Sequence, residues 1–397
     1  MKKSCCFFAG LAWLASASAD TPSTALPFTY SLNVRVRYED VNQAGLTEAE
    51  SFTVRTRLGL SAAPWHGWSA LLEAENIAPI DGDRYSQAGL NPGGAGRAVV
   101  ADPEGTELNQ AWLAFANGQT VLTGGRQRLV FDNARFIGDS GWRQNMQTLD
   151  AITLQDQTLP QTTLTYSWLG RINRVFGDRH PQGYWQSNSH LLNASYAGFS
   201  PGTLTGYAYW LDFGGSAAAQ SCATYGVSFT GATPLSGALK LTYRAEIATQ
   251  SDSGDSPLHY HANYSALEIG AAAKAGAFTV GHEALGGGDG VGFKTPLATL
   301  HAFNGWADLF LTTPATGLRD TYAKAAMNLT SGYNLLAYYH WFATDRSGPD
   351  PGREFDAQVS RKFGTHVTAL FKYADFQSTA AAYPKVRKFW AQVEFSY

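Results

Sequence analysis

The sequence predicts an all-β protein, a transmembrane antiparallel β-barrel of about 18 strands with short periplasmic turns and long external loops. Three observations support this prediction. Segments of alternating apolar and polar residues recur along the chain. The links between them are alternately short and long. After residue 19, no segment contains the roughly 20 consecutive apolar residues of a membrane-spanning helix, and in lipid only helices and closed barrels satisfy every backbone group.

The last nine residues show the clearest alternation. One face carries Phe389, Ala391, Val393, Phe395 and Tyr397, and the other carries Trp390, Gln392, Glu394 and Ser396. The edge of a half-buried soluble sheet can show the same pattern. An amphipathic strand that ends the chain on an aromatic residue is typical of the closing strand of an outer-membrane barrel. In a closed barrel this strand lies beside the first one, where Glu394 would meet Arg35 or Arg37.

The same period of two defines the candidate strands. They are Tyr30–Glu39, Ser51–Leu60, Trp68–Asn76, Glu107–Ala116, Thr120–Leu129, Gln147–Gln155, Thr162–Gly170, Asn188–Gly198, Thr203–Leu211, Ser221–Thr230, Ala238–Thr249, Leu258–Ala272, Ala277–Ala284, Arg319–Leu329, Tyr333–Ala343, Glu354–Lys362, His366–Ala374 and Val386–Tyr397.

The links between the strands indicate how the barrel is oriented. Links such as Asn117–Gln119 and Ser331–Gly332 are short, whereas Ile77–Thr106, Val130–Met146 and Leu285–Leu318 are long. Bacterial barrels have short periplasmic turns and long external loops, so we expect both termini in the periplasm. A soluble β-sandwich would have links of mixed length without this alternation.

The N-terminus predicts export. Residues 1–19 have the basic start, apolar centre and small-residue cleavage site of a signal peptide, which leaves 20–397 as the barrel. The whole chain has 29 basic and 32 acidic residues, and losing Lys2 and Lys3 leaves 27 against 32. This acidic balance argues against nucleic acid as a partner.

Four arginines on the first two strands are the first candidate pore-lining residues. Arg35 and Arg37 alternate with apolar residues, as do Arg55 and Arg57. An arginine facing lipid at mid-membrane costs about 2–4 kcal/mol, so we expect all four to point inward. Arg126 and Arg128 repeat the spacing on the fifth predicted strand. Such a ladder suits an anionic solute because arginine stays charged and binds carboxylates through two nitrogens.

The predicted lumen also contains acidic residues. Glu73 and Glu75 share a face of the third strand, and Glu246 lies near Arg244. The alternative to a cationic ladder is therefore mutual neutralisation, in which arginines pair with lumenal carboxylates.

The segment from Arg126 to Asn145 is the most unusual stretch, because it follows a strand and yet carries Phe131, Phe136, Ile137 and Trp142. These side chains need burial. If the loop folds into the barrel, it buries them, projects Arg135 and Arg143 into the channel and constricts it. If the loop packs on the barrel rim instead, it does not constrict the channel.

This segment resembles a signature of the alginate export family of outer-membrane proteins. The segments 281–287 and 292–308 resemble that family as well, and the resemblance extends from about Tyr30 to Tyr397. It implies a monomeric 18-stranded barrel in the bacterial outer membrane, surrounded by lipid and lipopolysaccharide, with an arginine-rich pore for polyuronate. It also implies that the pore-lining residues include Arg35, Arg37, Arg126, Arg128, Arg135 and Arg143.

The sequence departs from the family in one respect. The dedicated alginate exporter has an extended periplasmic loop that gates its pore, whereas every predicted periplasmic turn here is short. The residues therefore favour an ungated channel for anionic poly- or oligosaccharides, uronates first. A general small-solute porin is the alternative.

The remaining functional classes have less support in the residues. His259 and His261 do not complete a metal site, and no nucleophile motif stands near a histidine, so we expect no catalytic residue, metal or cofactor. A barrel-embedded hydrolase would turn over a lipid or peptide, and a structural or adhesin-like barrel would have a lumen closed by side chains.

Overall fold

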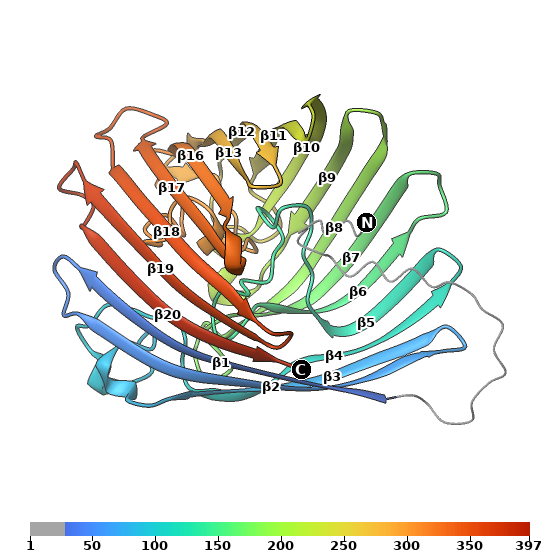
Figure 1. Cartoon of the computed structure of the whole chain (residues 1–397), viewed down its shortest axis with the longest axis horizontal. Coiled ribbons are helices and arrows are strands. Elements are labelled where there is room, and N and C mark those ends of the chain that lie inside the picture. Colours follow the sequence, from blue (N-terminus) through green and yellow to red (C-terminus); the bar gives the residue numbers. More distant parts are fainter. Residues whose placement is uncertain (1–27) are drawn as a thin grey trace.

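The structure, a computed structural model that describes residues 28–397, is a closed barrel of 18 antiparallel strands (Figure 1). The predicted signal peptide, residues 1–19, lies outside the described residues. The barrel strands are β1 (Phe28–Gln43), β2 (Ala49–Trp65), β3 (Trp68–Pro79), β4 (Gly105–Asn117), β5 (Thr120–Gln127), β6 (Thr148–Asp156), β7 (Thr162–Asn173), β8 (Tyr184–Phe199), β9 (Gly202–Leu211), β10 (Cys222–Ser236), β11 (Leu239–Ser251), β12 (His261–Ala273), β13 (Gly276–Leu285), β16 (Leu318–Asn328), β17 (Tyr333–Ala343), β18 (Gly352–Phe363), β19 (Val367–Ser378) and β20 (Val386–Ser396).

All 18 predicted strands are present, and most continue beyond their predicted ends. Five short 3₁₀ helices, Gly82–Arg84, Pro92–Gly94, Gly215–Gln220, Leu300–Ala302 and Thr330–Gly332, lie in the links. The link after β13 also contains a small hairpin that the alternation did not predict, formed by β14 (Gly287–Gly288) and β15 (Val291–Gly292). No helix in the described part of the chain is long and apolar enough to cross a membrane.

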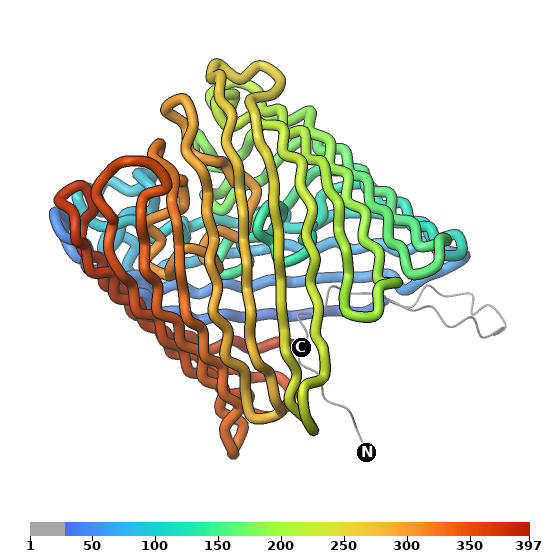
Figure 2. Tube along the Cα trace, turned by 90° about the horizontal axis from the view of Figure 1, so that it is seen from above, coloured from blue at the N-terminus to red at the C-terminus, as the bar shows by residue number. Residues whose placement is uncertain are grey.

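The sheet closes where β20 pairs with β1. Each strand pairs with its neighbours in the chain, and Figure 2 shows them side by side around the wall. In the closing register Arg35 is opposite Glu394 and Arg37 is opposite Gln392. This confirms that the last strand closes the barrel and that Glu394 lies beside the first strand.

The links alternate in length, as predicted. One end of the barrel has tight turns such as 66–67, 118–119 and 274–275. The other end has the long links, including 80–104, 128–147 and 286–317. Residues Phe28 and Ser396, the outer ends of β1 and β20, lie at the short-turn end, because every strand reverses direction.

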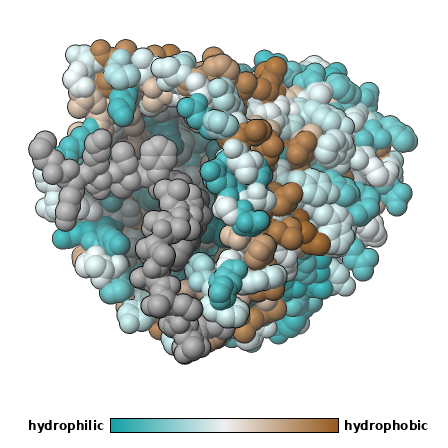
Figure 3. Space-filling model, turned by 90° about the vertical axis from the view of Figure 1, so that its right-hand side faces the viewer, coloured by the Kyte–Doolittle hydropathy of each residue, from teal (hydrophilic) through white to brown (hydrophobic). Residues whose placement is uncertain are grey.

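The outer and inner faces differ in chemistry. Large apolar side chains on the outer face are exposed, including Leu267 at 60% and Ile247 at 64%. The largest buried apolar cluster lies inside the barrel. Figure 3 looks onto the short-turn end, where a hollow is walled largely by hydrophilic residues. The barrel therefore has an apolar outer surface and a largely polar interior that is partly filled by protein.

Candidate functional site: the lumen and its two inner loops

Two long links fold into the barrel and pack on each other. We call 128–147 and 286–317 the inner loops. Ile137 and Leu297 form a parallel bridge, the Gly138 amide donates to the Leu297 carbonyl at 2.8 Å, and the Thr299 amide donates to the Ala134 carbonyl at 3.0 Å. The two inner loops therefore contact each other inside the barrel.

The aromatic residues of the first inner loop are buried, as the sequence predicted. Phe136 and Ile137 belong to the main apolar cluster, and Phe131 and Trp142 pack against it. The Phe136 ring lies 5.4 Å from that of Tyr207 on β9 and 5.9 Å from that of Phe293 on the second loop. Burial of this apolar surface holds the loop inside the barrel rather than on its rim.

The four strand arginines point inward, and three of them hold the first inner loop by its backbone. Arg35 Nη1 lies 3.2–3.3 Å from the carbonyl oxygens of residues 141, 142 and 143. Arg55 and Arg57 donate to the Gln144 carbonyl at 3.5 and 3.2 Å. These three arginines therefore face the lumen and also position the loop.

Each of these arginines also has a carboxylate partner. Arg35 and Arg55 both lie 3.2 Å from Glu394, and Arg57 pairs with Glu75. Three guanidinium groups thus share two carboxylates as direct partners at this wall, and Glu73 lies on the same face of β3 as Glu75.

The fourth strand arginine is fully enclosed. Arg37 lies 3.5 Å from Asp102 of the link 80–104, and its guanidinium lies 4.1 Å above the Trp142 ring. Glu73, the other predicted acid of β3, accepts hydrogen bonds from Asn109 at 2.6 Å and Gln110 at 3.1 Å.

The two arginines of the first inner loop make internal ion pairs. Arg135 is buried and binds both carboxylate oxygens of Glu283 on β13, at 2.7 and 3.1 Å, and Asn304 of the second loop at 2.9 Å. Arg143 binds Asp308 at 2.7 Å and lies 3.5 Å from Glu39. Arg135 does not project into open channel, because Glu283 and Asn304 take up its donors.

Arg126 and Arg128 do not lie on the inward face of β5, where the sequence predicted them. Arg126 shares the outer face of β5 with Leu122, and it pairs at the strand end with Asp150 at 2.7 Å. Strand β5 ends at Gln127, so Arg128 begins the loop, half exposed and paired with Asp139. The adjacent Gly124 and Gly125 leave too little alternation in this strand to determine which face is inward.

A polar centre anchors the second inner loop to the wall. His301 Nδ1 lies 2.7 Å from Asp308, and Lys372 of β19 lies 2.7 Å from His301 Nε2. Burial keeps the pKa of His301 well below its ordinary value, so the ring is neutral, accepting from Lys372 and donating to Asp308. Burial alone would raise the pKa of Asp308, but His301, Lys388 and Arg143 hold it well below its usual range.

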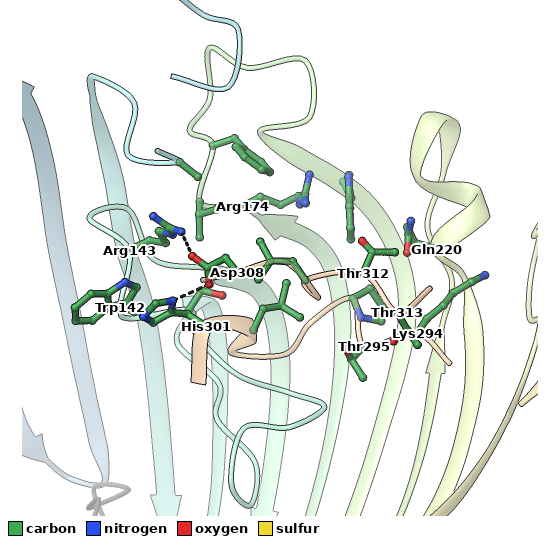
Figure 4. Close-up of a pocket in the computed structure, with 18 of the residues that line it drawn as sticks. Trp142, Arg143, Arg174, Gln220, Lys294, Thr295, His301, Asp308, Thr312 and Thr313 are labelled. Carbon is green, nitrogen blue, oxygen red and sulfur yellow. Dashed lines mark hydrogen bonds and ion pairs between the residues drawn. The ribbon is translucent and has the colours of Figure 1, made fainter. Parts of the chain in front are cut away.

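Above the inner loops, at the long-link end, is a cavity of about 350 Å³. It is lined by residues of five long links, among them Arg143, Arg174 and Lys294 (Figure 4). Asp308 is the only carboxylate in its wall, and Arg143 and Lys388 each bind that carboxylate at 2.7 Å. The cavity therefore carries an excess of positive charge.

Arg174 differs from the other arginines that face the interior. It follows β7, and its guanidinium lies 4.0 Å above the Trp185 ring and 4.7 Å above the Phe176 ring. Among residues 28–397 it has no carboxylate partner, and burial lowers its pKa to about 10. Strand periodicity does not predict Arg174 as a lumenal residue, because it lies just past the end of β7, where the alternation of faces no longer applies.

Comparison with known proteins agrees with this architecture. Residues 26–168 match the alginate export family. The match to the alginate export family covers β1 to β6 and most of β7, including the first inner loop and its arginines. Among curated proteins, none matches this chain.

Solved structures with the same fold include proteins of Pseudomonas aeruginosa and Acinetobacter baumannii. OccK9 (OpdG) of Pseudomonas aeruginosa has a TM-score of 0.73 at 16% identity, covering 93% of this chain and 98% of that one. OccAB3 of Acinetobacter baumannii has a TM-score of 0.74 at 11% identity, covering 93% and 99%. P. aeruginosa OccK2 (OpdF) in complex with glucuronate has a TM-score of 0.71 at 12% identity, covering 93% and 97%. At these low sequence identities, the comparison shows only that the fold is shared.

Within residues 28–397, no group of three or more His, Cys, Asp or Glu side chains is arranged to hold a metal ion. His259 lies outside the strands, 3.2 Å from Asp252, and His261 begins β12.

Proposed function

We propose that this protein is an outer-membrane porin that passes small anionic solutes, with uronates and short uronate oligosaccharides as the preferred class. It acts as a monomer without a cofactor and without catalysis, within outer-membrane lipid and lipopolysaccharide. The single observation that carries the proposal is the set of arginines at the wall where the first inner loop crosses the lumen. Arg35, Arg55 and Arg57 share only two direct carboxylate partners, Glu394 and Glu75.

A low-dielectric wall concentrates the field of these arginines within the lumen, although the chain as a whole is acidic. The arginine-rich match to the alginate export family supports an anionic polysaccharide class, and the barrel bound to glucuronate shares this fold. The inner loops occupy part of the lumen, which favours short uronates over a long polymer. Arg37, Arg135 and Arg143 support the loops, and Arg126 and Arg128 are not part of the pore lining that we propose.

The second candidate is a general small-solute porin without uronate selectivity. The extensive pairing of lumenal arginines with carboxylates favours it, because paired charges select weakly. The two functions differ in how strongly the barrel discriminates between anions and cations.

Reversal potentials of the purified barrel in planar bilayers test this choice. In a potassium chloride gradient we expect anion preference at neutral pH, greater at low salt because salt screens the lumenal field. Glucuronate should enter liposomes containing the barrel faster than glucose, which is nearly the same size. Cation preference would contradict the anion channel, and equal entry of both sugars would favour the general porin.

A further inference from the structure

The cavity above the inner loops contains an anion-binding arrangement outside the arginine cluster of β1 and β2. Its wall brings together Arg174, Arg143 and Lys294 with the aromatic rings of Phe176 and Trp185. Figure 4 shows Arg143 and Asp308 on one side, Lys294 on the other and Arg174 above them. The two inner loops supply most of the residues that line this cavity.

Arg174 has free hydrogen-bonding capacity in this position. A guanidinium has five N–H donors, and among the described residues Arg174 uses Nη1 alone, in a hydrogen bond of 3.0 Å to the Gln182 carbonyl. Of the other two cations, Arg143 is bound to Asp308. Lys294 has no carboxylate partner among the described residues; its ammonium donates to the Ala219 carbonyl at 2.6 Å and lies over the Tyr260 ring, so it adds a second positive charge to the cavity.

The backbone and the two rings hold Arg174 in place. Its amide donates to the Gly183 carbonyl at 2.8 Å, and its own carbonyl accepts from the Gly177 amide at 3.2 Å. Trp185, which stacks on the guanidinium, donates to the Gln182 side chain at 3.0 Å. A cation fixed in this way loses little conformational freedom when an anion binds.

We propose that Arg174 is the anion-binding group of an outer solute site, which takes a small carboxylate with a ring-shaped body such as a hexuronate. The forked guanidinium suits a carboxylate, and the cavity volume of about 350 Å³ is in the range of small-molecule sites. Phe176 and Leu311 supply apolar surface for the faces of the ring. This inference rests on the proposed anion-channel function and adds a second site to it.

Single-channel blocking by glucuronate tests the site. With glucuronate added on the long-link side, Arg174→Gln should shorten the blocking events about tenfold, as expected for one charged hydrogen bond. Arg174→Lys keeps the charge but loses the fork and the stacking, so it should also shorten them while conserving anion preference. Arg353→Gln, an exposed arginine on the outer face of β18, is the matched control and should change nothing.

The outcomes separate this site from the proposed function. Unchanged blocking in a folded Arg174→Gln barrel that remains anion-selective would overturn the site and leave the channel function standing. Blocking by inorganic phosphate that equals blocking by glucuronate would overturn the ring-binding part. If Arg174→Gln does not fold, Arg174→Lys decides, and normal glucuronate blocking in that variant would contradict the proposal. A parent barrel with neither anion preference nor glucuronate blocking would overturn the proposed function itself.

Discussion

At the scale of single residues, Glu394 pairs the closing strand with arginines of the first two strands. It accepts hydrogen bonds from Arg35, Arg55 and Asn33, so one carboxylate on the closing strand compensates two arginines on the first two strands. These contacts exist because β20 pairs with β1 in the register that puts Glu394 opposite Arg35. Barrel closure and lumenal charge are therefore coupled at this residue.

Replacing Glu394 by glutamine should increase anion preference. The amide oxygen still accepts from Arg35, but the two guanidinium groups lose their counter-charge. An ion pair in a hydrated setting is worth about 0.5–1 kcal/mol, which corresponds to a rise of about two- to fivefold in the anion-to-cation permeability ratio. The reversal potential measures this ratio. Asp375→Asn removes the same charge from the outer face of β19 and should leave the ratio unchanged.

At the scale of elements, the second inner loop is docked by backbone amides on two carboxylates of β18. The Ala307 amide donates to Glu354 at 2.6 Å and the Trp306 amide donates to Asp356 at 3.2 Å. Gly305 makes this close approach possible, because its φ is 85° and a Cβ there would collide with the Glu354 carboxylate. The glycine thus determines how closely the loop lies against the wall.

Gly305→Ala should loosen the second inner loop. The clash and the positive φ together cost about 1–3 kcal/mol. We expect faster tryptic cleavage after Lys294 and noisier single-channel currents. Gly332→Ala is the matched control, because Gly332 has a φ of 79° but open space at its Cβ position. Equal cleavage in the two variants would show that docking on Glu354 does not restrain the loop.

At the scale of the whole molecule, the barrel is asymmetric from end to end. Tight turns connect the strands at one end. The long links lie at the other end, and they include the inner loops and line the cavity. Bacterial barrels keep their short turns in the periplasm, so we expect the Arg174 cavity to face the exterior. A solute entering the cell would then meet Arg174 first and the arginines of β1 and β2 afterwards.

Cysteine labelling on intact cells tests this orientation. Ala381 lies exposed in the long link 379–385, and Gln119 lies exposed in the tight turn 118–119. A membrane-impermeant maleimide should label Ala381→Cys on intact cells, and label Gln119→Cys only after the cells are broken. Cys222 is buried and should not react. Labelling of Gln119→Cys on intact cells would reverse the proposed orientation.

The sequence by itself determined the 18 strands, their antiparallel order, the closing strand and the inward direction of Arg35, Arg37, Arg55 and Arg57. These features are local, because a period of two and the length of each link are both read within one segment. The alternation did not predict that Arg126 lies on the outer face, because two adjacent glycines interrupt the pattern there.

Only the tertiary structure decided what each arginine contacts. The packing of 128–147 on 286–317 and the burial of Arg135 against Glu283 join residues far apart in the sequence, and the stacking of Arg174 on Trp185 depends on how the link between β7 and β8 folds. A loop has no period that relates its sequence to a direction in space. The partners of a loop arginine are therefore set by the barrel that encloses the loop and by the other loops that enter the same lumen.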